Sequence, residues 1–351
     1  MEFAPSYLRL LAMNAVDARG VLRYLAGNGS ESSPYHTYSV VILPQGVTAI
    51  QNNAFDGCHS LTSVTLPEGL TVIRECAFRA CVSLTSIALP DGLISIGDRA
   101  FMRCTFLTSV TLPDGLTIIG DHAFYECTSL TEINFPKKLT AIKNGAFHAC
   151  SNLKTVALPD GMTIIWDHAF AGCRSLTEIN FPKGMAFIGN GVFAECTNLT
   201  SVTLPDGLTI IGKFAFDGCK NLTCVNFSDG LISIGEMAFA GNSLTSATLP
   251  AGLIDIGERA FDACRSLIEI NFPESLVSIG SAAFRGSCLT SVILPKGLTI
   301  IGSGVFRGCT GLISVNFPES MTSIGEFAFN NCVSLTSVTL PDGLTAIEEG
   351  A

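Results

Sequence analysis

The sequence predicts a repeat solenoid of 23-residue coils, in which short parallel strands are stacked into one sheet and joined by irregular or short helical return segments. Three observations lead to this fold class. A proline and a phenylalanine each recur at a fixed step, the two recur in phase, and the apolar spacing inside each unit alternates as in a short strand. Hydrophobic residues make up 48% of the 351 residues and charged residues only 14%, which supplies enough apolar material for a continuous core.

The first marker of the repeat is a proline that follows Leu or Phe. The step between units is 23 residues, except from Ser228, which takes the place of the proline, to Pro250 and from Pro273 to Pro295, where it is 22. The second marker is a phenylalanine, found at Phe55, Phe78, Phe101, Phe124, Phe147, Phe170, Phe193, Phe216, Phe239, Phe261, Phe284, Phe306 and Phe329. Units this short cannot bury their own apolar face, so they are expected to stack and to form columns of identical side chains.

One unit shows how a coil is built. Val64 and Leu66 are expected to face the core, while Ser63 and Thr65 face outward, because side chains alternate along a strand. Pro67 cannot donate a hydrogen bond to a sheet and therefore ends the strand. The chain then turns and returns along the far side of the coil through Leu70, Ile73, Phe78 and Cys81.

Residues 112–134 read LPDGLTIIGDHAFYECTSLTEIN, and the same pattern runs from about residue 38 to residue 351. This pattern resembles the BspA-type leucine-rich repeats. The resemblance implies a leucine-rich repeat solenoid. It also implies a role of the kind associated with that family, which is protein interaction and, in surface proteins of bacteria and protists, adhesion to host or matrix proteins. A shared fold does not fix the function of one member.

The chain is expected to divide into residues 1–34, an N-terminal helix and linker, and residues 35–351, the leucine-rich repeat array. Residues 6–26 are predicted to form a helix that caps the first coil, with Ser6 as its N-cap and Gly27 after its C-terminus. A flexible appendage and a poorly formed targeting segment are the alternatives. The repeat stops at Ala351, before the phenylalanine that should follow, which suggests that the array is truncated there.

The charge pattern and the apolar runs narrow the classes of partner that the chain is expected to bind. The net charge is -10 and the acidic residues are dispersed, so the chain has no electrostatic reason to bind nucleic acid or anionic lipid. Apolar runs of 18 residues do not occur, and Arg9 and Asp17 interrupt the N-terminal apolar stretch. We therefore expect no membrane segment and no signal peptide, which leaves the cytoplasm and the cell surface as alternatives.

Cysteine is the most conspicuous residue type with chemical potential. Eleven of the 14 cysteines share one repeat position: Cys58, Cys81, Cys104, Cys127, Cys150, Cys173, Cys196, Cys219, Cys264, Cys309 and Cys332. We expect a column of buried free thiols, with a metal site or a disulfide ladder as the alternatives. The acidic residues follow repeat positions and the five histidines fit surface variation. The sequence thus predicts no enzyme, no metal site and no cofactor.

The outward face of the strands is the predicted binding surface. The exposed position before the Leu-Pro or Phe-Pro pair carries Asn in alternate units, and Glu stands two residues earlier in three of them, which gives Asn134, Asn180, Asn226, Asn271, Asn316, Glu132, Glu178 and Glu269. These side chains either form a recognition face or only satisfy one another along a polar sheet. Trp166 is a candidate exposed anchor. We expect a non-enzymatic, adhesin-like interaction module that binds a protein or cell-surface ligand, with an intracellular scaffold or rigid spacer as the alternative.

Overall fold

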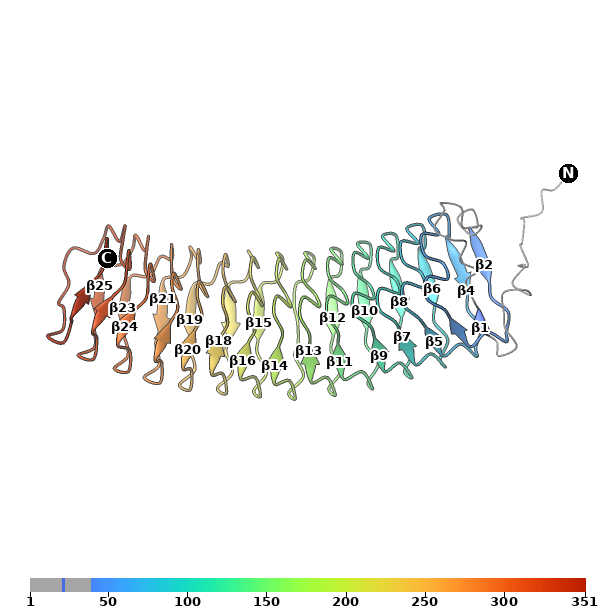
Figure 1. Ribbon diagram of the computed structural model, residues 1–351, viewed down its shortest axis with the longest axis horizontal. Coiled ribbons are helices and arrows are strands. Elements are labelled where there is room, and N and C mark those ends of the chain that lie inside the picture. The colour runs from blue at the N-terminus through green and yellow to red at the C-terminus, as the bar shows by residue number, and fades with distance from the viewer. Residues whose placement is uncertain (1–20, 23–38) are drawn as a thin grey trace. The chain divides into compact units, whose positions relative to one another are not determined.

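The protein is described by a computed structural model that places residues 21–22 and 39–351. The chain divides into two compact units, residues 1–162 and 163–351. Within each unit, coils of 22 or 23 residues contribute short parallel strands (Figure 1). The predicted fold class, a leucine-rich repeat solenoid, is confirmed.

Unit 1 contains two rows of strands. The first row has three residues per strand: β2 (Val40–Ile42), β4 (Ser63–Thr65), β6 (Ser86–Ala88), β8 (Ser109–Thr111), β10 (Glu132–Asn134) and β12 (Thr155–Ala157). The second row has two residues per strand: β1 (Val21–Leu22), β3 (Ala49–Ile50), β5 (Val72–Ile73), β7 (Ser95–Ile96), β9 (Ile118–Ile119) and β11 (Ala141–Ile142). Hydrogen bonds join β2 to β4, β6 through β12, and β1 through β9 along their rows.

Unit 2 repeats this arrangement. Its three-residue strands are β15 (Ser201–Thr203), β17 (Cys224–Asn226), β19 (Ser246–Thr248), β21 (Glu269–Asn271), β23 (Ser291–Ile293) and β25 (Ser314–Asn316). Its two-residue strands are β13 (Ile164–Ile165), β14 (Phe187–Ile188), β16 (Ile210–Ile211), β18 (Ser233–Ile234), β20 (Asp255–Ile256), β22 (Ser278–Ile279), β24 (Ile300–Ile301), β26 (Ser323–Ile324) and β27 (Ala346–Ile347). The three-residue row is paired only as β15 with β17, β19 with β21, and β23 with β25.

The three-residue strands follow the alternation that the sequence predicts. In β4 the middle residue, Val64, is buried, whereas Ser63 and Thr65 are exposed. The same exposed–buried–exposed order holds in every other strand of this row. The strand ends at the proline, and a turn follows in which the Leu70 N–H donates to the Pro67 carbonyl oxygen at 3.1 Å. Leu66, predicted to face the core, is only partly buried.

The second row of strands corrects the prediction of a single sheet. Val72 and Ile73 of β5 lie in parallel register with Ser95 and Ile96 of β7, so part of the return segment is itself a strand. Two residues are too few to show a period of two in the sequence, which is why the segment was expected to be irregular or helical. The structure contains no helix within residues 21–22 and 39–351.

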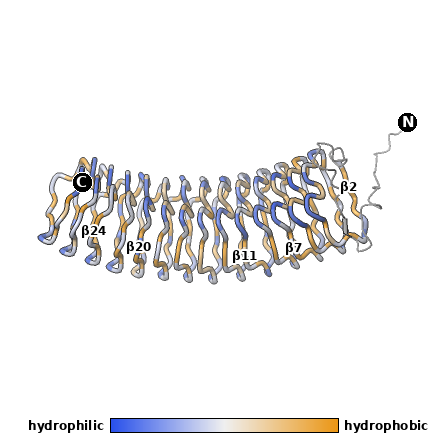
Figure 2. The backbone as a smooth tube through the Cα atoms, viewed as in Figure 1, coloured by the Kyte–Doolittle hydropathy of each residue, from blue (hydrophilic) through white to orange (hydrophobic). Residues whose placement is uncertain are grey.

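The core consists of columns of identical side chains. Successive phenylalanine rings stack nearly parallel, as between Phe193 and Phe216 and between Phe216 and Phe239, with ring centroids 5.4 Å apart in both pairs. The leucine, isoleucine and cysteine columns that include Leu70, Ile73 and Cys81 are buried, except in the last coil, where Leu344 is half-buried and Ile347 is exposed. Figure 2 shows the consequence, since hydrophobic and hydrophilic segments alternate along every coil.

Two positions in most coils adopt a left-handed backbone, a feature that the sequence did not reveal. One precedes the Ala-Phe pair, as at His122 with φ of 58°, and one precedes the cysteine position, as at Ala263 with φ of 57°. Glycine fills these positions in some coils, for example Gly308 with φ of 74°. The non-glycine residues there carry a conformational cost.

The predicted N-terminal helix is not supported where the structure describes it. Val21 and Leu22, inside the range 6–26, form strand β1 and pair in parallel with Ala49 and Ile50 of β3. The chain at this point continues the two-residue row, because the edge of β3 offers hydrogen-bonding groups that a strand satisfies and a helix does not. The rest of residues 1–34, including the expected linker, lies outside the described residues.

Candidate interaction surface

The predicted binding residues all lie on the outward side of the three-residue row and are exposed. Glu132 and Asn134 are the first and last residues of β10, and Glu269 and Asn271 occupy the same places in β21. The last residues of β17 and β25 are Asn226 and Asn316. Asn180 forms an isolated bridge with Thr203, and Glu178 lies two residues before it. One residue pair thus belongs to unit 1, and the others belong to unit 2.

Some of these amides form hydrogen bonds to a neighbouring coil, as expected if the side chains satisfy polar groups along the sheet. The Asn226 Nδ2 donates to the Thr203 Oγ1 of the preceding coil at 3.1 Å. The Asn271 Oδ1 accepts from the Leu249 N–H at 2.8 Å, and its Nδ2 donates to the Leu249 carbonyl oxygen at 3.3 Å. The asparagines are therefore not equivalent, although their spacing in the sequence makes them look so.

A ladder of threonines borders the same face. The Thr108 Oγ1 donates to the Thr85 carbonyl oxygen at 3.1 Å, and the Thr131 Oγ1 donates to the Thr108 carbonyl oxygen at 3.4 Å. Each hydroxyl thereby links its coil to the one before. The surface of the row is consequently polar and regular, with its backbone partly supported by its own side chains.

Sequence reasoning missed a second surface on the row of two-residue strands. Five successive coils of unit 2 each expose one large aliphatic side chain beside or at the start of a strand: Ile210, Ile232, Ile254, Val277 and Ile300. The signal was present, because these coils read Thr-Ile-Ile, Ile-Ser-Ile, Ile-Asp-Ile or Val-Ser-Ile and so contain one more aliphatic residue than the core column needs. Exposed apolar residues gathered on one side of a protein are typical of interaction surfaces.

Trp166 follows β13, and 43% of its surface is exposed. Its side chain is thus accessible, as an anchor requires. Aromatic residues of this size are frequent among the dominant contacts of protein interfaces. Its role as an anchor remains a proposal.

The cysteine column consists of buried free thiols, as predicted. Thiols such as those of Cys104 and Cys264 donate to the carbonyl oxygen of the phenylalanine one coil earlier, at 3.1 Å in both cases. Burial raises the pKa of the Cys104, Cys150 and Cys196 thiols to about 12. Thiols held protonated and out of solvent are poor nucleophiles and poor metal ligands. Among the described residues, no group of three or more His, Cys, Asp or Glu side chains is placed to hold a metal ion.

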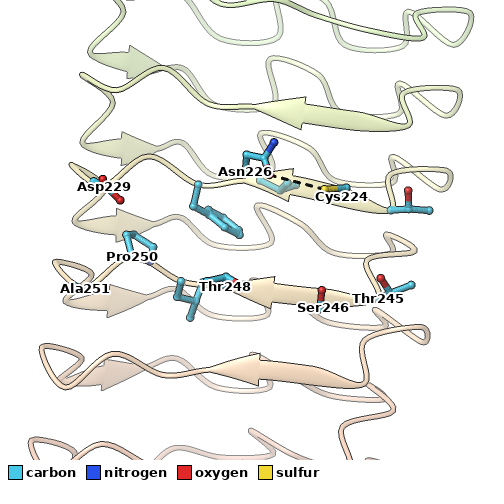
Figure 3. A pocket seen from close by; sticks show the side chains of 12 residues that line it. Cys224, Asn226, Asp229, Thr245, Ser246, Thr248, Pro250 and Ala251 are labelled. Atoms are coloured by element: carbon cyan, nitrogen blue, oxygen red, sulfur yellow. Dashed lines mark hydrogen bonds between the residues drawn. The ribbon is translucent and has the colours of Figure 1, made fainter.

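A groove opens on the three-residue row of unit 2, between β17 and β19. These two strands are not hydrogen-bonded to each other, although both are paired on their other side. The groove has a volume of about 560 Å³. Figure 3 shows its lining, with Cys224 and Asn226 on one strand and Ser246 and Thr248 on the next.

The repeat itself identifies the wider relationship of the chain. The model of the BspA type leucine-rich repeat region matches overlapping segments, 35–154, 73–200, 117–243, 187–299 and 277–351. These segments together span residues 35–351. The chain belongs to the BspA-type leucine-rich repeat family. No curated protein sequence matches it at a significant level of similarity.

Solved structures of bacterial leucine-rich repeat proteins are similar to this member of the BspA-type family. A leucine-rich repeat protein from Bacteroides ovatus is 33% identical over 87% of this chain and 79% of its own, with a TM-score of 0.74. A leucine rich cell surface protein from Faecalibacterium prausnitzii is 27% identical over 90% of this chain and 88% of its own, with a TM-score of 0.55. A leucine-rich repeat protein from Eubacterium ventriosum, 22% identical over 89% of this chain and 87% of its own with a TM-score of 0.52, shares the fold.

The described residues form no helix that is long and apolar enough to cross a membrane.

Proposed function

We propose that this protein is a non-enzymatic interaction module that binds a protein or cell-surface ligand through the outward side of its three-residue strands, in an adhesin-like role. The observation that carries the proposal is the contrast between the buried side chains and the exposed outward ones. The columns of Leu, Ile, Phe and Cys are buried and hold the coils together, whereas the outward positions are exposed and vary between coils. Variation on a rigid, repetitive frame is how solenoids create extended binding surfaces.

The similarity to a cell surface protein from Faecalibacterium prausnitzii supports the adhesin-like role. Surface biotinylation of intact source cells tests it directly. Labelling of the protein on intact cells supports a surface role, and labelling only after lysis contradicts it.

The binding face is tested with the purified chain immobilised on a biosensor and probed with extracellular-matrix proteins. The double variant Glu178→Ala/Asn180→Ala removes two exposed side chains of the proposed face, and Ile232→Ser serves as the matched control on the two-residue row. We expect the double variant to weaken binding and the control to retain it. The opposite pattern would move the interface to the row of aliphatic side chains.

An intracellular scaffold or rigid spacer is the second candidate, and the cysteine column favours it. All of these thiols are free, which suits a reducing compartment. Capture of the protein from cytosol, with no labelling on intact cells, is the result expected for this candidate.

A further inference from the structure

The groove between β17 and β19 lies at a coil that is one residue shorter than most. The turn from Phe239 to Leu244 spans five residues, whereas the equivalent turn from Phe216 to Leu222 spans six. The hydrogen-bonded ladder of the three-residue row stops between β17 and β19, although β18 and β20 of the same coils remain paired. The row is also open between β21 and β23, at the other shortened coil, and between β4 and β6, where the coil has 23 residues.

The shortened coil is unfavourable for stability in two ways. An interrupted ladder leaves backbone groups of two strand edges without sheet partners, which costs free energy. In addition, Asn242 stands in the cysteine column with only 3% of its surface exposed, and neither its Nδ2 nor its Oδ1 has a hydrogen-bond partner. Sites that break the local rules of a fold are expected where function requires them.

The groove lining has a consistent chemistry. It offers the amide of Asn226, the carboxylate of Asp229 and the hydroxyls of Thr223, Ser246 and Thr248, and it contains no Lys or Arg. The Asn226 Nδ2 donates to the Thr203 Oγ1, which fixes the amide, and its Oδ1 lies 4.0 Å from the Cys224 Sγ of the same strand. Asp229 is exposed, and among the residues that the structure describes its carboxylate has no ion-pair or hydrogen-bond partner.

We propose that this groove binds a neutral glycan. A carboxylate and an amide oxygen accept hydrogen bonds from neighbouring sugar hydroxyls, and the Ser and Thr hydroxyls can donate or accept as the sugar requires. The uncompensated carboxylate disfavours phosphate, sulfate and other anionic ligands. Of the apolar lining residues, Val225, Leu249 and Pro250 are buried and Phe227 is half-buried. A peptide is less well matched, because little apolar surface is open to anchor one of its side chains.

A second groove of about 360 Å³ repeats the same chemistry within unit 2. It lies between β25 and residues 337–341, and Asn316, Glu319, Ser337 and Thr339 take the places of Asn226, Asp229, Ser246 and Thr248. Here too the three-residue row is open, since residues 337–339 form no strand. The two grooves are four coils apart, or roughly 20 Å at ~4.8 Å per strand, so a glycan with repeating units can engage both.

The experiment begins with a microarray of neutral, sialylated and sulfated glycans, probed with the complete 351-residue chain. Neutral glycans that bind are then titrated by isothermal calorimetry, using a short oligosaccharide that fits one groove. We expect two sites per chain. Binding should be at least about tenfold weaker at one site in Asp229→Asn and in Glu319→Gln, and at both sites in the double variant, since a hydrogen bond to a charged group contributes on that order.

A matched variant separates the groove from the rest of the face. Asp206→Asn changes the same repeat position after β15, which is hydrogen-bonded to β17, and should leave binding unchanged. Absence of any neutral-glycan ligand, preference for anionic glycans, or binding that survives the double variant would overturn the proposal. Its outcome does not depend on the protein-binding role proposed above.

Discussion

Replacement of Phe216 by alanine tests whether the aromatic column holds the coils of unit 2 together. Phe216 is fully buried, and its ring stacks on Phe193 and Phe239 with centroids 5.4 Å apart on both sides. Loss of a buried phenylalanine costs about 3–5 kcal/mol of unfolding free energy, and each stacked pair adds about 0.5–1.5 kcal/mol beyond burial. We therefore expect a loss near 5 kcal/mol, because two stacked pairs disappear and the neighbouring coils cannot close the space.

The assay is urea unfolding followed by circular dichroism, with hydrogen exchange to locate the effect. Since each coil contacts only its neighbours, protection should fall first in the coils next to residue 216. Phe214→Ala is the matched control, because Phe214 lies in the same coil but is only partly buried, and it should lose about 1 kcal/mol or less. A loss below about 2 kcal/mol for Phe216→Ala, or equal losses for both variants, would refute the column as the main stabilising feature.

Three other changes have defined outcomes. Asn242→Cys removes two buried polar atoms that lack partners and should raise the unfolding free energy by about 1–3 kcal/mol in urea titrations; a decrease would contradict the reasoning. Ala263→Gly should stabilise the protein by up to about 1 kcal/mol because φ is 57° at that position. Gly308→Ala should destabilise it by a similar amount, although the nearest atom lies 3.8 Å from the added Cβ. Shifts of the melting temperature in the same direction for both variants would exclude a backbone origin. The buried thiols stay protonated in the folded state, as for Cys264 with its pKa raised to about 12, whereas thiols of the unfolded chain ionise near pH 9. The unfolding free energy should therefore be unchanged below pH 9 and should fall from there to about pH 12. A flat stability curve over that window would count against this reasoning. Rapid labelling of column thiols in the folded protein at neutral pH would also contradict it, because only the exposed Cys224 and the partly exposed Cys288 should react there.

The candidate surface was predictable only in part. The sequence placed Asn134, Asn180 and Glu178 correctly on the outward side of the strands, because a period of two assigns side chains to faces. It could not separate Asn226, which lines an open groove, from Asn271, whose amide holds the backbone of the preceding coil. That difference depends on which neighbouring strands are hydrogen-bonded to each other, which the repeat pattern does not encode.

The fold itself was determined by the sequence to a large extent. A 23-residue period with Leu, Phe and Cys at fixed positions allows one solution, in which identical residues stack and bury one another. The repeat pattern is therefore sufficient to predict the fold class, the core columns and which side chains of the three-residue strands point outward.

Only the tertiary structure decided the rest. The two-residue strands exist because neighbouring coils offer hydrogen-bond partners at that place, and no local pattern encodes them. The left-handed residues, such as Ala263, are imposed by the closure of each coil against the preference of the side chain. Likewise, strand β1 forms at Val21–Leu22 because the edge of β3 is available, and the groove opens where β17 and β19 are not hydrogen-bonded to each other. In each case a contact between coils outweighs the local tendency of the chain.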